Sequence, residues 1–515
     1  MARGKPWRIF LLKQTHRSPW LETWAILWRY PTMKTLLSLC LLLVCGLASA
    51  AQPNVLFLFA DDMRSDSLAA LGDPVVKTPH LDALVQRGFT FTNAYNLGGN
   101  SPAVCMPSRN MMMSGRAYTR WKDYLPAGAP EPRRGKMSPG DGPNFPLSMK
   151  AAGYETWHFG KKGNSANLIQ AKFDHVHYLE QDHMDREHGE PGREIIDGAI
   201  QFVSQRSDEK PFFMYLGFSN PHDPRVAAQS YRDLYVEEQM PLPKNYLPVH
   251  PFDNGEMMVR DEMISPWPRT EAEIRRTWRD YYATITGLDA QIGRLLKVLQ
   301  ERGLMENTII LFSADQGIAI GSHGLLGKQN LYDHSAKAPL VVAGPGIPKG
   351  KSTALVHLLD IYPTVCDLVG TNPPASIDGV SFKPVILGQS KSAREALLLT
   401  YVDKQRGLRD ERYKLIRYPQ PDVTQLFDLE SDPLEMEDLS RRAELQERKQ
   451  AMLKKLAEMQ TKFGDDLPLT VAHPQPAKWK IPTPEEIKVL LPKWKMEDSQ
   501  EHRAGGPPPF PLRKH

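Results

Sequence analysis

The sequence predicts an α/β fold in which helices flank a large, mostly parallel sheet, joined to a smaller C-terminal domain with an antiparallel sheet. Three observations support this prediction. Apolar runs without polar alternation recur in the first part of the chain, as is typical of strands buried on both faces of a parallel sheet. Amphipathic helical segments separate these runs. After about residue 387 the pattern changes to short strands and turns.

The expected elements follow one another regularly. The run NVLFLFADD, residues 54–62, is predicted to be a buried strand that ends in two carboxylates. Residues 78–95 read as a helix and then a strand, and the order of helix, glycine and strand recurs over residues 145–163. The remaining expected elements are a helix over 193–206, a strand over 210–217, a long helix over 270–303, and strands over 308–314 and 338–343.

The predicted domains follow from this pattern. Residues 51–387 are expected to form the large domain, and residues 388–463 a small α+β domain with a helix from about 441 to 462. From residue 464 the chain is rich in proline and ends in GGPPPFPLRKH. Residues 464–515 are therefore expected to be an extended or disordered tail.

The N-terminal region has the layout of a secretory signal peptide. Residues 33–50, MKTLLSLCLLLVCGLASA, place a lysine before an apolar run that ends in Ala-Ser-Ala. The apolar run over residues 36–47 is too short to span a bilayer comfortably, so no stable membrane insertion is expected. We expect an exported protein, periplasmic or secreted, and interpret residues 1–32 as a spurious extension ahead of the true start at Met33.

The exported protein is expected to begin at Ala51, because the Ala-Ser-Ala sequence directly before it is the usual cleavage pattern. N-terminal sequencing of the exported product measures this directly. Any residue from 1–32 in the mature chain would contradict the prediction.

Composition excludes several classes of protein. The 515 residues carry 64 basic and 60 acidic side chains, and no basic stripe interleaved with aromatics indicates a nucleic-acid partner. Loss of the signal peptide would remove Cys40 and Cys45. Only Cys105 and Cys366 would then remain, too few for a disulfide scaffold even if they paired. A buried cysteine is usually inert, but Cys105 lies among Pro, Ser and Arg, where a loop is expected. We therefore interpret it as a reactive residue.

Polar side chains follow several of the expected strands. In parallel sheets the ligand site gathers at the carboxyl ends of the strands. Converging oxygen ligands suit Ca²⁺ or Mg²⁺, whereas the short His and Cys spacings of a zinc site are absent. An N-cap is the simpler interpretation of the first two carboxylates alone. The residues at these ends are Asp61, Asp62, Lys161, His222, Asp315 and Gln316.

The cysteine motif points to a family. CMPSRNMMMSGR, residues 105–116, matches the pattern C-x-P-S-R-x-x-x-L/M-T/S-G-R at every defined position. The segments NVLFLFADD, NPHDP, SADQG, GSHGLLGKQNLYDHS and the stretch from Gly153 to Lys161 extend the match over most of the chain. The chain resembles the formylglycine-dependent sulfatases, which belong to the alkaline-phosphatase-like superfamily.

The resemblance implies an alkaline-phosphatase-like fold and a role for each residue. Cys105 would be oxidised to formylglycine (3-oxoalanine) by a formylglycine-generating enzyme that reads Pro107 and Arg109 before folding. One hydroxyl of the hydrated aldehyde would attack sulfur, and the second would later expel sulfate. The implied roles are metal binding for Asp61, Asp62, Cys105, Asp315 and Gln316, support of the nucleophile for Arg109, sulfate binding for Lys161, His222 and Lys328, and help to the leaving group from His222 and Lys328.

Two positions depart from the family pattern. Gln316 stands where relatives usually carry Asn or His, and its amide oxygen can still bind a metal. Gly163 stands where relatives carry the His of GKWH. That His helps to deprotonate the second hydroxyl, so its loss puts the expulsion of sulfate in doubt. His158 is a nearby candidate to replace it.

The leading functional hypothesis is an exported hydrolase of sulfate monoesters, with sulfated carbohydrates as the expected substrates. Alternatives are a phosphoester or phosphonate hydrolase of the same superfamily and a non-catalytic protein that binds sulfated glycans. Several further side chains could recognise a sugar or could simply be paired within their loops. They are His250, Asp253, Asn254, Arg260 and Asp261 in HPFDNGEMMVRDE, and Arg225 in NPHDPR.

Overall fold

The computed structural model describes residues 52–121, 137–179, 189–207, 210–483, 485–486 and 489. The predicted signal peptide, the extension before it and the last part of the predicted tail lie outside these residues. Residues from Pro53 onward belong to one compact unit.

A central sheet of eight strands forms the core of this unit. Apart from β9, its strands run in one direction, which confirms the predicted mostly parallel sheet. Its strands, in spatial order, are β10 (Gly350–Ser352), β2 (Phe89–Phe91), β9 (Leu340–Ala343), β8 (Thr308–Ala314), β1 (Asn54–Ala60), β7 (Phe212–Gly217), β5 (Glu155–Gly160) and β6 (His175–Tyr178).

The opposite direction of β9 has a physical cause. A strand parallel to β8 would need a crossover connection that returns the chain to the end of the sheet where β8 begins. The connection over residues 315–339 holds α11 (Asp333–Ala336) as its one described α-helix. Gly317 N donates to Ser335 O, so both ends of this connection stay together. The next strand therefore starts at the carboxyl end of β8 and runs back.

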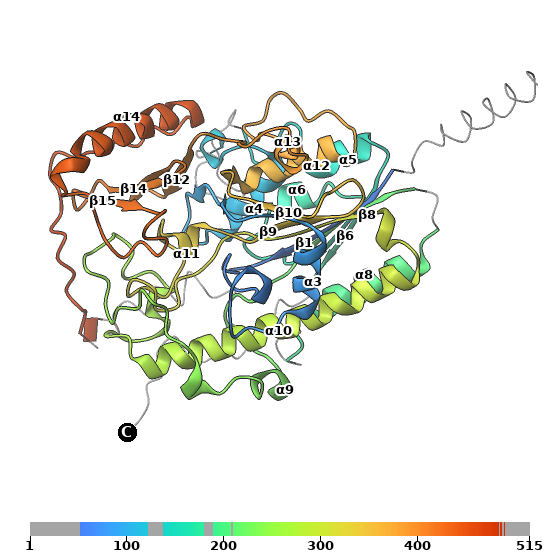
Figure 1. Cartoon of the computed structure of the whole chain (residues 1–515), viewed down its shortest axis with the longest axis horizontal. Helices are drawn as coiled ribbons and strands as arrows, with labels where there is room; N and C mark the ends of the chain where they lie inside the picture. The colour runs from blue at the N-terminus through green and yellow to red at the C-terminus, as the bar shows by residue number, and fades with distance from the viewer. Residues whose placement is uncertain are drawn as a thin grey trace, which may run out of the picture. The chain divides into compact units, whose positions relative to one another are not determined.

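Helices cover both faces of the sheet. Figure 1 shows α3 (Pro79–Arg87), α8 (Arg193–Gln205) and α10 (Glu271–Glu301) on one face. The other face carries α4 (Cys105–Ser114), α5 (Phe145–Ala151) and α12 (Ile361–Leu368). Thr270 and Glu273 form a capping box that starts α10, the longest of these helices. None of the helices in the described part of the chain combines the length and the apolar character needed to cross a membrane.

Shorter elements lie outside the large sheet, and two of them, β3 (Ala94–Tyr95) and β11 (Val356–His357), pair in parallel as a separate two-stranded sheet. The others are α6 (Asn167–Gln170), α9 (Gln229–Arg232), α13 (Lys383–Ile386), and the 3₁₀ turns Ala69–Leu71, Tyr118–Arg120, Glu237–Gln239, Glu262–Ile264, Met305–Asn307, Leu358–Asp360 and Ala443–Leu445.

The C-terminal part forms a second sheet covered by α14 (Gln446–Phe463). Four strands form the predicted antiparallel sheet: β15 (Val423–Asp428), β14 (Tyr413–Tyr418), β13 (Gln405–Arg409) and β12 (Leu397–Tyr401). The fifth strand, β4 (Gly98–Gly99), comes from the N-terminal part and pairs with β12 in parallel. A Cβ on Gly98 would lie 1.7 Å from the carbonyl oxygen of Thr400, so this pairing requires glycine.

The described residues after α14 are mostly exposed, but several contacts join them to the rest of the protein. Arg406 holds Asp465 in a bidentate ion pair, with Nε and Oδ2 2.6 Å apart. Farther along, Ala477 O accepts from the backbone N–H of Asp253 at 2.8 Å. The segment after α14 therefore returns to the loop that holds the candidate sugar-reading residues.

Candidate active site

The strand ends of the central sheet are level with one another. Ala60 at the end of β1 pairs with Ala314 at the end of β8, so the carboxylates that follow each strand emerge side by side. Gly160 at the end of β5 likewise pairs with Gly217 at the end of β7. Lys161 therefore emerges beside the loop that contains NPHDP. The pattern predicted from the sequence, with polar residues at adjacent strand ends, brings these side chains to one edge.

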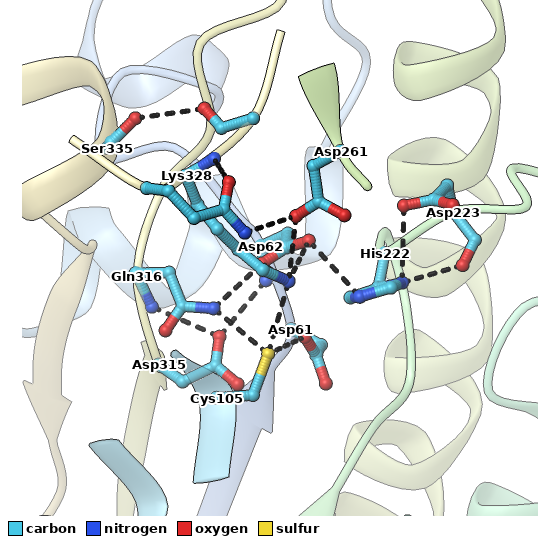
Figure 2. A network of polar contacts seen from close by, with 12 residues as sticks. Asp61, Asp62, Cys105, His222, Asp223, Asp261, Asp315, Gln316, Lys328 and Ser335 are labelled. Atoms are coloured by element: carbon cyan, nitrogen blue, oxygen red, sulfur yellow. Dashed lines mark hydrogen bonds and ion pairs between the residues drawn. The ribbon is translucent and has the colours of Figure 1, made fainter. Parts of the chain in front are cut away.

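Cys105 lies at the centre of the cluster (Figure 2). It is the first residue of α4, not part of a loop as the sequence suggested, and it is 1% exposed. Pro107 is compatible with this helix because the first turn needs no backbone N–H from it. The Cys105 thiol donates to Asp61 Oδ1 at 3.1 Å and accepts from Gln316 Nε2 at 3.1 Å and Lys328 Nζ at 3.3 Å.

Arg109 lies one turn farther along α4 and is completely buried. Its Nε donates to Asp315 Oδ2 at 2.9 Å, and an NH2 proton goes to Asp61 Oδ2 at 3.1 Å. A third bond, from NH1 to Tyr215 Oη at 3.2 Å, holds the far end of the guanidinium. One arginine thus holds two carboxylates from different strands in fixed positions.

The other predicted cations also reach the cluster. Lys161 Nζ donates to Asp61 Oδ2 at 2.7 Å, and Lys328 Nζ donates to Asp62 Oδ1 and Oδ2 at 2.9 and 2.8 Å. His222 Nε2 lies 3.6 Å from Asp62 Oδ2, and its Nδ1 lies 2.6 Å from Asp223 O. All the predicted site residues therefore come together.

The donor set fits a hard divalent cation. One ligand atom each from Asp61, Asp62, Cys105 and Asp315 lie within 4.8 Å of one another. The amide of Gln316 faces the same atoms through Nε2, which donates to Asp62 Oδ1 at 2.8 Å and to Cys105 Sγ at 3.1 Å. A flip of this amide would turn Oε1, which is buried without a hydrogen-bond partner among the described residues, toward a metal ion. Carboxylate and amide oxygens suit Ca²⁺ or Mg²⁺. Asp62 has φ of 60°, a strained backbone for a residue with a side chain.

The charges of the cluster perturb its acidic groups in different directions. Burial alone would raise the pKa of Asp61, but Lys161 and Arg109 hold it well below its ordinary value. Burial and the negative charge of Asp61 raise the pKa of Asp315 to about 6. Burial, together with Asp315 and Asp61, raises the pKa of the Cys105 thiol well above its usual range. Because the thiolate is the reactive form, unmodified Cys105 is a poor nucleophile at neutral pH.

His158 does not lie where it could replace the histidine that relatives carry at the position of Gly163. It belongs to β5, and its ring packs on Phe173, Tyr178 and Tyr215. Both ring nitrogens are buried without a hydrogen-bond partner among the described residues. Burial and the charge of Arg109 lower its pKa to about 3. His158 is thus a core residue of the sheet, below the layer that contacts Cys105.

Three of the six candidate sugar-reading residues bond within their own loop. His250 Nδ1 lies 2.7 Å from Phe252 O, and the carboxylate of Asp253 accepts from Gly255 N at 2.9 Å. Asn254 Oδ1 accepts from Glu256 N at 2.9 Å. These contacts favour the interpretation that the three residues fix the loop.

Arg260 and Asp261 belong to the same loop but join the site. Arg260 NH1 donates to Asp223 Oδ1 at 3.0 Å and to Asp261 Oδ1 at 2.9 Å. Asp261 Oδ2 lies 4.0 Å from Lys328 Nζ. A chain of charges thus links the loop of His222 to Lys328.

Two tyrosines of the site could not be identified from the sequence. Tyr215 lies within the apolar run of β7, and Tyr281 within α10. Tyr215 supports Arg109, and the hydroxyl of Tyr281 donates to Asp62 O at 2.9 Å. In the sequence both tyrosines have the pattern of core residues. The groups that their hydroxyls contact belong to distant segments, so no local sequence pattern indicates a role in the site.

Comparison with known families and relatives agrees with this geometry. The sulfatase family matches residues 53–371, and the family described as N-sulphoglucosamine sulphohydrolase, C-terminal, matches residues 321–462. The N-acetylglucosamine-6-O-sulfatase of Bacteroides thetaiotaomicron is 26% identical over 505 residues, covering 81% of this chain and 88% of the relative. The ulvan-active sulfatase of Formosa agariphila is 29% identical, covering 81% and 82%.

Solved structures share the fold. A protein solved with its substrate D-glucosamine-2-N,6-O-disulfate matches with a TM-score of 0.68 at 24% identity, over 81% of this chain and 99% of that one. The phosphonate monoester hydrolase of Agrobacterium radiobacter matches with a TM-score of 0.66 at 21% identity, over 80% and 96%. With its signature residues gathered at one edge of the sheet and the family match spanning residues 53–371, the chain belongs to the sulfatase family of sulfuric ester hydrolases.

Proposed function

We propose that this protein is an exported enzyme that hydrolyses sulfate monoesters of carbohydrates. It would use formylglycine at position 105 and a bound divalent cation, for which Ca²⁺ is the first candidate and Mg²⁺ the second. The observation that carries the proposal is the convergence of Arg109, Lys161, Lys328 and His222 on Cys105 and three buried carboxylates. The sulfated sugars in the names and ligands of relatives support a carbohydrate substrate.

The chain's own residues suit a sulfate group. Lys161 and Lys328 bring positive charge to the cluster through their ion pairs with Asp61 and Asp62. The N-terminus of α4 adds a partial positive charge at Cys105. Such preorganised positive groups stabilise the negative charge that develops on sulfate oxygens and on the departing alcohol.

His222 has the orientation of a proton donor to the leaving group. If its Nδ1–H donates to Asp223 O, the 2.6 Å contact fixes the ring and leaves Nε2 to exchange the proton. That nitrogen faces Asp62, on the Cys105 side. The arrangement matches the role that the family resemblance implies for this residue.

The poor reactivity of a buried, protonated thiol supports modification of Cys105. Formylglycine would supply a hydroxyl nucleophile in place of the thiol. A cation held by Asp61, Asp62, Asp315 and Gln316 would lower the pKa of that hydroxyl and neutralise sulfate charge. The protein's part is to hold this group between the cations described above.

Release of sulfate and of phosphate from matched aryl esters tests the proposal. We expect kcat/KM for an aryl sulfate to exceed that for the corresponding aryl phosphate and phenylphosphonate ester. Higher activity on the phosphorus esters would favour the second candidate, which the structural likeness to a phosphonate monoester hydrolase suggests. Binding of sulfated glycans without any turnover would indicate a non-catalytic protein.

Gly163 is expected to slow the second half of the reaction. Without a histidine at this position, sulfate release should limit turnover, and a burst of alcohol should precede a slow steady state. Gly163→His should raise the steady-state rate by about 10²-fold, in the range of general-base assistance. Stopped-flow detection of an aryl alcohol measures both phases.

Gly163→Ala is the matched control, since it adds a side chain at the same backbone position but no base. It should leave the slow phase unchanged. Burst-free kinetics at a normal rate in the parent enzyme would contradict the prediction and show that another group has taken the role.

A further inference from the structure

Arg225 is a cation beside the site that the roles above do not use. It lies three residues after His222 and is partly exposed. Its Nε is buried without a hydrogen-bond partner in the described part of the protein. The guanidinium carbon lies 5.4 Å from the centre of the Tyr281 ring, which is within the range of a cation–π contact.

This contact fixes Arg225 relative to the carboxylate cluster. Tyr281 is fully buried, and its hydroxyl donates to Asp62 O at 2.9 Å and accepts from Arg64 N at 2.9 Å. The ring that supports the guanidinium thus contacts the backbone of a site carboxylate. A side chain held in this way loses little further conformational freedom when it binds a ligand.

The neighbouring cations already have carboxylate partners. Lys161 pairs with Asp61, Lys328 with Asp62, and Arg260 with both Asp223 and Asp261. Among the residues described, Arg225 makes no hydrogen bond and no ion pair. A guanidinium has five N–H donors in a fork that matches a carboxylate or a sulfate group.

We propose that Arg225 binds a second anionic group of the substrate, a carboxylate or a further sulfate ester, beside the sulfate that is hydrolysed. The proposal rests on the proposed sulfatase activity of this site. The simpler alternative is that Arg225 only balances the negative charge of Asp223. Arg260 already fills that role through two direct contacts. The unused donors of Arg225 are therefore left for a ligand.

Three matched substrates test the proposal: a monosulfated sugar bearing a carboxylate, the same sugar with a second sulfate ester instead, and the monosulfated sugar without a second anionic group. Arg225→Gln should lower the ratio of kcat/KM between a doubly anionic and the singly anionic substrate by about 10- to 100-fold, the effect of losing a charge-assisted hydrogen bond. Arg225→Lys should retain part of the preference. The doubly anionic substrate that loses more identifies the natural second group.

Arg232→Gln is the matched control. Arg232 is a partly exposed arginine of α9, 3.6 Å from Asp280, and its loss removes the same charge outside the site. It should leave the ratio unchanged. An unchanged ratio in Arg225→Gln, or an equal change in Arg232→Gln, overturns the proposal.

Calorimetry separates this proposal from the sulfatase proposal. The Cys105→Ala protein, in which binding is measured without turnover, is titrated with the doubly and singly anionic sugars before and after Arg225→Gln. Weaker binding of only the doubly anionic sugars supports the second-anion site, even if no ester is hydrolysed by the parent enzyme. Equal binding of all three sugars by both proteins overturns it.

Discussion

Cys105→Ala is expected to abolish hydrolysis of aryl sulfates, lowering kcat by at least about 10⁴-fold, as is usual when a nucleophile is removed. The side chain is 1% exposed and contacts Asp61, Gln316 and Lys328. Alanine fits the same space because it only removes the sulfur atom. Apart from Arg109 of α4, the carboxylates and cations around it belong to other segments and should keep their places, so the fold should survive.

Cys366→Ala provides the matched control. Cys366 is likewise buried, and burial raises its pKa to about 12, but it lies in α12 and takes no part in the cluster around Cys105. It should retain turnover. Release of nitrophenol and thermal unfolding of both variants separate loss of chemistry from loss of fold. An active Cys105→Ala enzyme would refute the mechanism.

The modification itself has a direct signature. The peptide that contains Cys105 should lose sulfur and gain an aldehyde, which mass spectrometry of the parent protein detects. We expect the unmodified fraction to be inactive, because burial keeps its thiol protonated. Activity that does not rise with the modified fraction would contradict this account.

The strand ends of the site could be predicted because their signal is local. Asp61, Lys161 and Asp315 each directly follow a strand of the central sheet, and the parallel register of these strands brings the three side chains to one edge. Lys328 has no strand before it and was identified by resemblance alone. Its position depends on the long connection between β8 and β9, where Gly327 N donates to Glu262 Oε1 at 2.8 Å.

Other features depend on contacts between distant segments. β4 is two residues long and becomes a strand only because β12, some three hundred residues later, pairs with it. The segment just before Cys105 is thereby anchored to the C-terminal sheet. Neither its length nor its composition could indicate a strand. The direction of β9 could not be predicted from the sequence either, because it depends on where the connection after β8 ends in space.

Removal of the metal is expected to inactivate the enzyme, and Asp315→Asn should weaken Ca²⁺ binding by at least about 100-fold. Loss of an outer partner of a ligand already costs about 10- to 100-fold in affinity, and Asp315 would be a ligand itself. Its Oδ1 accepts from Asp62 N and Gln316 N, both at 3.1 Å. Asparagine can keep these bonds, so the variant removes charge with little change in shape.

Asp289→Asn is the matched control for this variant. Asp289 is also a buried carboxylate whose pKa burial raises to about 6, but it accepts from Leu81 N at 2.7 Å at the start of α3. Losing its charge should not change Ca²⁺ affinity. Calorimetry of metal-free protein with Ca²⁺ and with Mg²⁺ measures each variant. Full activity after chelation, or equal weakening in Asp289→Asn, would show that these carboxylates do not hold a catalytic metal.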